Sequence, residues 1–236
     1  MALPAPEDVH VWAIDLARDA SEVGALGGLL SAEELRRAAG VRTEDGRRRF
    51  VVTRAALRAL LGRYLGFEPQ ALAFAEGPHG KPRLEPRSPL RFNVSHSGEL
   101  ALVACARERE VGIDVEWTVR ERDVPGLVRA YLAVNERAAV AEAPATDVAF
   151  YRHWVAKEAF AKADGRGVAR SLRAVEVALD EPSGPRIVHV GGDELEAARW
   201  SLDLLDGLPD GYVAALVVEA GAHARPVASF DPLRAQ

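Results

Sequence analysis

Apolar and polar residues alternate with a period of two in several short segments of residues 1–110. This period is typical of half-buried strands. Ser31 and Glu34 form a capping-box pattern that should begin a helix, and a longer helical pattern runs from about Glu44 to Leu65, where Gly66 should end it. The alternating segments predict four strands, which lie near residues 9–16 and around Phe74, Phe92 and Leu102.

Residues 111–236 contain a second mixture of strands and helices. Residues after about 220 carry little pattern, which is typical of a loose tail. The order of elements predicts an α+β fold with two halves, residues 1–110 and 111–236. In the second half, helical patterns occupy about 125–132, 136–141 and 147–164, and strand patterns lie at 111–117 and around Val175, Ile187, Trp200 and Val213.

The strand segment VGIDVEW carries two carboxylates. Asp114 and Glu116 occupy alternate positions, so both should point to the same face of the strand. Their Cα atoms would lie about 6.6 Å apart at a rise of about 3.3 Å per residue, which lets their oxygens converge on one hard cation such as Mg²⁺. Taken alone, these residues favour a strand with a solvated acidic face over a metal site.

The segment WVAKEAFAKADGRG changes that balance. On a helical wheel, Glu158 and Lys162 fall among aromatic and aliphatic residues. The polar arc, which should be solvated, holds His153, Lys157 and Asp164. A surface pair of Glu and Lys four residues apart would stabilise the helix by about 0.2–0.5 kcal/mol, but such a pair would have polar neighbours. Charged side chains on an apolar stripe are usually paired, bound to metal or placed in a cleft.

The segment RFNVSHSGELALVACA predicts two strands joined by a polar turn at Ser95–Glu99. Ser95 next to His96 resembles a hydrolase nucleophile and base, but adjacent residues on an extended chain point to opposite faces. In a loop, the hydroxyl, the imidazole and the backbone amides could all donate to phosphate oxygens. A turn that the Ser and His side chains merely stabilise explains the same pattern equally well.

Four motifs, in this order, resemble the signature series of the 4′-phosphopantetheinyl transferases: GPHGKPRL, FNVSHSG, GIDVE and FYRHWVAKEAFAKADGRGV. The resemblance is to the two-domain type that activates surfactin synthetase and related assembly lines, and it runs from about Ser31 to about Leu179. Each motif alone is weak, but the set is highly specific. The resemblance implies two similar α+β halves related by a pseudo-twofold axis, with the site in the cleft between them.

The resemblance also implies roles for individual residues. Asp114, Glu116 and Glu158 match the acids that hold Mg²⁺ against the coenzyme A pyrophosphate. Glu158 also matches the residue often assigned as the base for the incoming serine. Three further side chains match contacts to coenzyme A. They are Lys162, His96 and Lys81 of GKP. Lys162 and His96 would also serve catalysis at the phosphates. Ser95 matches a fourth contact to coenzyme A.

An arginine near the start of the long helix completes the set. Arg48, in the run DGRRRF, matches the region that grips the 3′-phosphate end of coenzyme A. Arg47 and Arg49 are alternatives, because the alignment can slip by one residue. The planar guanidinium donates two parallel hydrogen bonds to a phosphate monoester. Most arginines on helices are solvated, so only one or two of this cluster should contact the ligand.

The composition excludes several other classes of protein. With 236 residues, 48% of them hydrophobic, the chain can bury a substantial core. A formal net charge of -5 argues against general nucleic-acid binding. Cys105 is the sole cysteine, which rules out an intrachain disulfide and favours a reducing compartment. The first residues show no leader pattern and no apolar run reaches membrane-spanning length, so we expect a cytoplasmic monomer.

The sequence therefore predicts a Mg²⁺-dependent transferase. It would move 4′-phosphopantetheine from coenzyme A to a serine of an apo acyl or peptidyl carrier protein and release adenosine 3′,5′-bisphosphate. Two alternatives use the same residues. A metal-dependent nucleotide or diphosphate hydrolase would use water as the nucleophile, and a non-catalytic scaffold would bind coenzyme A and dock carrier domains. The residue pattern does not identify the carrier.

Overall fold

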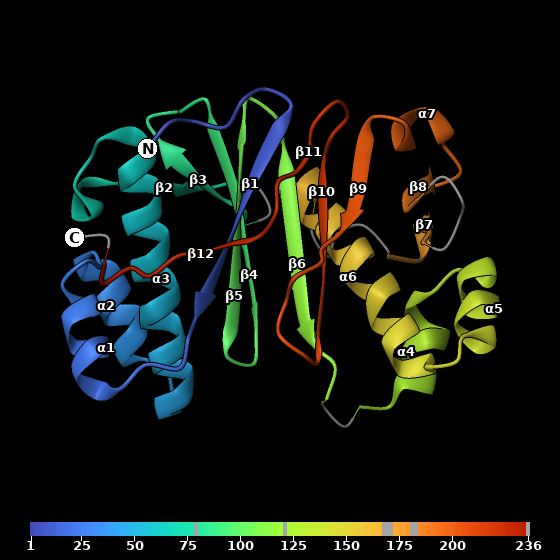
Figure 1. Ribbon diagram of the computed structural model, residues 1–236, viewed down its shortest axis with the longest axis horizontal. Coiled ribbons are helices and arrows are strands. Elements are labelled where there is room, and N and C mark those ends of the chain that lie inside the picture. The colour runs from blue at the N-terminus through green and yellow to red at the C-terminus, as the bar shows by residue number, and fades with distance from the viewer. Residues whose placement is uncertain (78–79, 120–121, 167–171, 180–183, 235–236) are drawn as a thin grey trace.

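The two longest helices, α3 (Glu44–Leu65) and α6 (Thr146–Asp164), pack against different β-sheets (Figure 1). The computed structural model describes residues 1–77, 80–119, 122–166, 172–179 and 184–234. It confirms the predicted α+β class. The pseudo-twofold relation between the halves stays a prediction. Within the described ranges, no helix is both long enough and apolar enough to cross a membrane.

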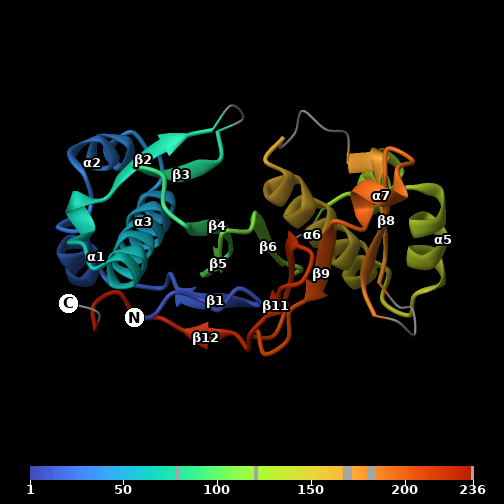
Figure 2. The ribbon, with the colours of Figure 1, turned by 90° about the horizontal axis from the view of Figure 1, so that it is seen from above.

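The first half is built on a sheet in which the strand order is β11-β1-β5-β4, with β12 also paired to β1. Helices α1 to α3 lie on one side of this sheet and share one apolar core with it (Figure 2). A separate hairpin, β2 and β3, extends from this half. The remaining elements are β1 (Asp8–Asp15), α1 (Ala20–Gly27), α2 (Ala32–Ala39), β2 (Ala73–Glu76), β3 (Pro82–Glu85), β4 (Leu90–Ser97) and β5 (Leu100–Arg107).

The second half is built on the three-stranded sheet β6-β10-β9. Helix α6 packs against β6 and β10 on one side and against α4, α5 and β7 on the other. A second small sheet pairs β7 with β8. The elements are β6 (Val111–Trp117), α4 (Val124–Tyr131), α5 (Val134–Glu142), β7 (Val175–Ala178), β8 (Arg186–Val190), α7 (Glu194–Ala197), β9 (Trp200–Leu204) and β10 (Tyr212–Glu219).

Elements with local sequence signals form where they were predicted. Helix α3 has the predicted bounds and ends at Gly66, whose φ of 71° is left-handed. Both hydrogen bonds of the predicted capping box between Ser31 and Glu34 are present at the start of α2. The short elements α1, β3 and α7 were not predicted. Of the quoted motifs, Pro78, His79 and the residues from Gly167 to Val168 lie outside the described residues.

The prediction of a loose tail after about residue 220 is wrong. Ala222 is fully buried, and the strands β11 (His223–Ala224) and β12 (Ala228–Ser229) both pair in parallel with β1. Phe230 is buried in the core of the first half and packs edge-on against Trp12. Two-residue strands are too short to produce a period in the sequence. The chain therefore returns from the second half, and residues 223–229 form a strap along the β1 edge of the first sheet (Figure 2).

A close approach of β6 to α6 explains the glycine of the GIDVE motif. A Cβ atom built at Gly112 would collide with the carbonyl oxygen of Ala159 and with the backbone nitrogen of Ala163. Any larger residue would push the helix away from the strand. The absence of a side chain at Gly112 thus brings the charged residues of α6 within reach of the carboxylates on β6.

Candidate active site

The carboxylates of β6 face the neighbouring strand β4, where the two halves meet. Ser95 Oγ donates a hydrogen bond to Asp114 Oδ1 over 2.8 Å, and Ser97 Oγ donates to Glu116 Oε2 over 3.0 Å. These bonds confirm the prediction that both acids share one face of the strand. The side chain of Asp114 is only 8% exposed. The alternative of a solvated acidic face is therefore wrong for Asp114.

Lys162 of α6 reaches across to the same acids. Its Nζ donates to Asp114 Oδ1 over 2.7 Å, to Ser95 Oγ over 2.9 Å and to the carbonyl oxygen of Ile113 over 3.1 Å. All three donors of the ammonium group therefore have oxygen acceptors. The ion pair joins the two elements, β6 and α6, rather than neighbouring turns of one helix. Lys162 is thus paired, as expected, but its side chain is 28% exposed, so the face of α6 that carries it is not the buried face.

Glu158 lies one helical turn before Lys162 and completes the acidic group. Burial raises the pKa of the Glu158 carboxyl, and the negative charge of Asp114 raises it further. The positive charge of Lys162 opposes this rise, and Glu116 adds to it. Ionisation of Glu158 in the folded protein therefore costs free energy, and an additional positive charge in the site would reduce that cost.

The chemistry of these residues fits a hard divalent cation. Asp114 Oδ2 is buried and accepts no hydrogen bond within the protein. Such an oxygen normally has a partner, and carboxylate oxygens are the preferred ligands of Mg²⁺. Within the described residues, however, no group of three or more His, Cys, Asp or Glu side chains stands ready to hold a metal ion. Ser95 and Lys162 both bind Oδ1 of Asp114, which leaves Oδ2 for a cation.

The prediction of a solvated arc on α6 is wrong. Lys157 is 1% exposed and forms a buried ion pair with Glu136 of α5. His153 is also buried, with its Nδ1 2.9 Å from the carbonyl oxygen of Ala149, and the side chain of Asp164 is 6% exposed. The helical-wheel argument assumed one solvated face, whereas α6 is covered by β6 and β10 on one side and by α4, α5 and β7 on the other.

Ser95 and His96 lie within a strand rather than in a turn. Strand β4 continues to Ser97, so the polar turn is shorter than the predicted Ser95–Glu99. The backbone of β4 pairs with β5 as far as Ser97, which removes the predicted loop of free amides. As expected for adjacent residues of a strand, Ser95 is buried and His96 is exposed. His96 lines a cavity of about 370 Å³ together with Arg49, Phe50, Glu116 and Arg122.

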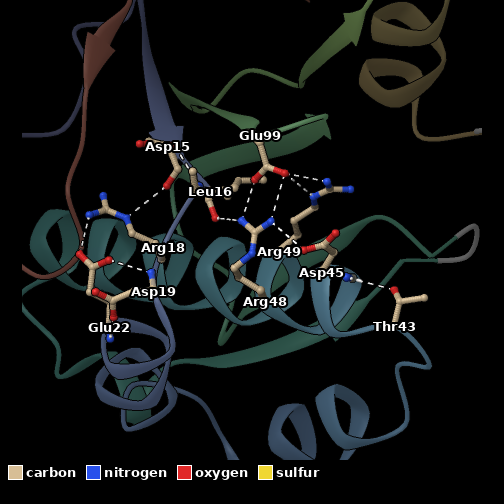
Figure 3. Close-up of polar contacts among 12 residues, drawn as sticks. Asp15, Leu16, Arg18, Asp19, Glu22, Thr43, Asp45, Arg48, Arg49 and Glu99 are labelled. Atoms are coloured by element: carbon tan, nitrogen blue, oxygen red, sulfur yellow. Dashed lines mark hydrogen bonds and ion pairs between the residues drawn. The ribbon is translucent and has the colours of Figure 1, made fainter.

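Figure 3 shows how Arg48 and Arg49 converge on Glu99. Arg48 donates to both oxygens of Glu99, over 2.6 and 3.1 Å, to Asp45 over 3.1 Å and to the carbonyl oxygen of Leu16. Its guanidinium is thereby committed to protein oxygens. Arg49 donates to Glu99 over 2.6 and 3.2 Å, and these bonds together hold the pKa of Glu99 below its usual value. Of the two, only Arg49 lines the cavity with His96.

Lys81 joins the first half to the second. Its Nζ donates to Glu110 Oε2 over 2.8 Å and to the carbonyl oxygens of Val111 and Ala163 over 3.1 and 3.2 Å. The lysine thus links the β2–β3 hairpin region to the start of β6 and the end of α6. It also lines a second cavity, of about 390 Å³, whose apolar part is formed by Leu84, Leu90 and Phe92 and whose other cationic side chains are Arg83, Arg87, Arg91 and Arg166.

The structure thus brings Ser95, Asp114, Glu116, Glu158 and Lys162 into one group. Lys81 and the pair of Arg49 and His96 lie in separate cavities near it. The sequence reasoning missed Asn93 and Ser97, whose side chains hydrogen-bond to β6. The pattern N-x-S-x-S, with three short polar residues at a period of two, could have indicated that one polar face of β4 meets another strand.

Comparisons with known proteins identify the family. Residues 110–217 match the model of the 4′-phosphopantetheinyl transferase superfamily, and residues 19–108 match that of the 4′-phosphopantetheinyl transferase N-terminal region. The chain is 37% identical over 220 residues to the 4′-phosphopantetheinyl transferase HetI of Nostoc sp.. This match covers 91% of this chain and 89% of the relative. It is 39% identical over 152 residues to the putative 4′-phosphopantetheinyl transferase slr0495 of Synechocystis sp., covering 62% and 61% of the two chains.

Solved structures show a partial likeness. The crystal structure of the holo-[acyl-carrier-protein] synthase from Neisseria meningitidis is 25% identical, with a TM-score of 0.37. The match covers 47% of this chain and 96% of the synthase.

Proposed function

This chain belongs to the 4′-phosphopantetheinyl transferase superfamily, and from that membership we propose the reaction that its site performs. The protein transfers 4′-phosphopantetheine from coenzyme A to a serine hydroxyl of an apo carrier protein. A bond forms between the serine oxygen and the phosphorus attached to pantetheine. The bond from that phosphorus to adenosine 3′,5′-bisphosphate breaks, and the serine proton leaves.

The observation that carries this proposal is the grouping of Asp114, Glu158 and Lys162 where β6 and α6 meet. Phosphoryl transfer needs positive charge against the pyrophosphate and a base for the incoming hydroxyl. Asp114, Glu116 and Glu158 would hold Mg²⁺, which when bound neutralises the charge of the pyrophosphate. The raised pKa of Glu158 suits a residue that accepts the serine proton, directly or through one water molecule.

Lys162 and His96 would stabilise negative charge on the leaving phosphate. The ammonium group of Lys162 is bound to three oxygens, so a phosphate oxygen would replace one of them. Asp114 is the natural partner to be replaced, because Ser95 would still hold Oδ1 while Oδ2 binds the cation. Ser95 would contact the coenzyme only through Lys162, since its hydroxyl is committed to Asp114.

Two further contacts to coenzyme A are part of the proposal. Lys81 would contact the coenzyme from the basic cavity beside the hairpin. For the 3′-phosphate, the contacts of Arg48 favour its neighbour Arg49, which lies in the same cavity as His96. Arg47 is exposed at the surface of α3. The proposal also includes a monomer that acts in the cytoplasm without nucleic-acid or membrane partners; the formal net charge of -5 argues against general nucleic-acid binding.

The proposal is tested by incubating the protein with coenzyme A, Mg²⁺ and a panel of apo carrier proteins, and weighing the products. The expected result is a carrier heavier by one phosphopantetheine together with adenosine 3′,5′-bisphosphate. Chelation of the divalent cation should abolish the product. The same nucleotide formed without any carrier would favour the hydrolase, and binding of coenzyme A with no turnover on any carrier would favour the scaffold.

A further inference from the structure

Three short polar side chains of β4 form a regular ladder to the backbone of β6. Asn93 Oδ1 accepts a hydrogen bond from the amide of Ile113 over 2.9 Å. Ser95 Oγ accepts from the amide of Val115 over 3.4 Å, and Ser97 Oγ accepts from the amide of Trp117 over 3.0 Å. Each donor lies twenty positions after its acceptor in the sequence. The two strands therefore run parallel and in register.

This ladder joins two sheets that share no backbone pairing at this edge. Strand β6 pairs with β10 on one side only, and β4 pairs with β5 on one side only. The open edge of β6 would otherwise leave buried amides without acceptors, at a cost of about 1–3 kcal/mol each. Asn93, Ser95 and Ser97 are 5%, 7% and 5% exposed, so water has little access to them. Their side chains replace the missing strand.

Two of the three side chains make a second bond, to a carboxylate. A serine hydroxyl has one proton and can accept further hydrogen bonds on its oxygen. Because Ser97 accepts from the amide of Trp117, its proton is available to Glu116 Oε2. In the same way Ser95 accepts from an amide and from Lys162, and donates to Asp114. In this ladder Asn93 binds the amide of Ile113 and makes no hydrogen bond to a carboxylate.

We propose that Ser97 and Ser95 are positioning residues that orient the carboxylates of Glu116 and Asp114, whereas Asn93 only aligns the strand. This inference rests on the proposed function, in which both carboxylates bind the divalent cation. Each hydroxyl occupies one carboxylate oxygen and thereby fixes the rotation of the group, which directs the other oxygen toward the cation. Partners of this kind outside the ligand set typically change metal affinity by about 10–100-fold when removed.

Binding of Mn²⁺, measured by calorimetric titration in the absence of coenzyme A, tests the proposal without relying on turnover. Ser97→Ala should weaken Mn²⁺ binding by about 10–100-fold. Asn93→Ala removes an acceptor from the same ladder and is the matched control. It should lower the melting temperature to a similar extent while leaving Mn²⁺ affinity unchanged. Ser97→Thr keeps the hydroxyl and should bind Mn²⁺ as the unsubstituted protein does.

Three results would overturn the inference. They are an unchanged Mn²⁺ affinity in a folded Ser97→Ala variant, an equal loss in Asn93→Ala, and a Ser97→Thr affinity no better than that of Ser97→Ala. Ser95→Ala provides an independent test at Asp114 should Ser97→Ala not fold. Failure of the proposed function gives a different result, because the unsubstituted protein would then bind no Mn²⁺ or would transfer no phosphopantetheine.

Discussion

The buried ion pair between Lys157 and Glu136 is a direct test of how α6 is held. Both side chains are 1% exposed. Burial lowers the pKa of Lys157, and the charge of Glu136 opposes that shift. Glu136 also accepts hydrogen bonds from the amides of Ala133 and Val177, over 2.7 and 2.9 Å. The pair therefore ties α5, α6 and β7 together, immediately beside Glu158 in the sequence.

Lys157→Met should leave Glu136 as a buried charge without a cation. Breaking a buried pair in this way costs about 3–5 kcal/mol. Because Glu136 keeps two backbone donors, the expected loss lies near the lower figure, about 3 kcal/mol. For a chain of this size, about 2–4 °C of melting temperature corresponds to each kcal/mol, so the melting temperature should fall by about 6–12 °C.

Thermal and denaturant unfolding would measure this loss. Arg199→Met is the control, because Arg199 is 59% exposed and pairs with Glu196 on the surface, where such pairs contribute at most about 1 kcal/mol. Adding Glu136→Gln to Lys157→Met removes the stranded charge and should recover part of the stability. A Lys157→Met variant no less stable than Arg199→Met would refute the reasoning. Lys162→Ala should instead lower the transfer activity, because it removes the ammonium group that is bound to Asp114.

Three other substitutions test separate features. Asp114→Ala removes a proposed metal ligand and should lower turnover by more than about 100-fold, which steady-state kinetics at saturating Mg²⁺ would check. Glu158→Gln should raise the melting temperature at neutral pH in metal-free buffer. Because burial raises the pKa of Glu158, its protonated form favours the folded state. This contribution to the free energy of unfolding is complete below the ordinary glutamate pKa and is lost as the pH rises through the raised pKa. The difference in melting temperature between Glu158→Gln and the unsubstituted protein should therefore vanish in acid. Phe230→Ala should cost about 3 kcal/mol in denaturant unfolding, because the ring is buried against Trp12; a loss below about 0.5 kcal/mol would mean that the strap is not part of the core.

Local patterns predicted most of the elements. The bounds of α3 follow from residues within the helix and from Gly66, and the shared face of Asp114 and Glu116 follows from the period of a strand. These predictions succeeded because each used a geometry that a single element imposes on its own residues.

The errors all involve contacts between distant segments. The wheel of α6 could not show that α5 and β7 cover the face of Lys157. The continuation of β4 to Ser97 depends on its pairing with β5, and the second set of bonds made by Ser95 depends on β6. Arg48 is held by Glu99, fifty-one positions away. Such partners become visible only when the chain is folded.

The strap along the edge of the first sheet has a consequence for how the protein is made. Strand β1 forms parallel pairs with residues 223–224 and 228–229, and Arg225 binds Asp8 across 217 positions of sequence. During synthesis, folding usually proceeds from the N-terminus in complete units. Here one edge of β1 stays unpaired until residues 223–229 have been synthesised. A polypeptide released from the ribosome before that point would present this edge to other chains, and open strand edges promote aggregation.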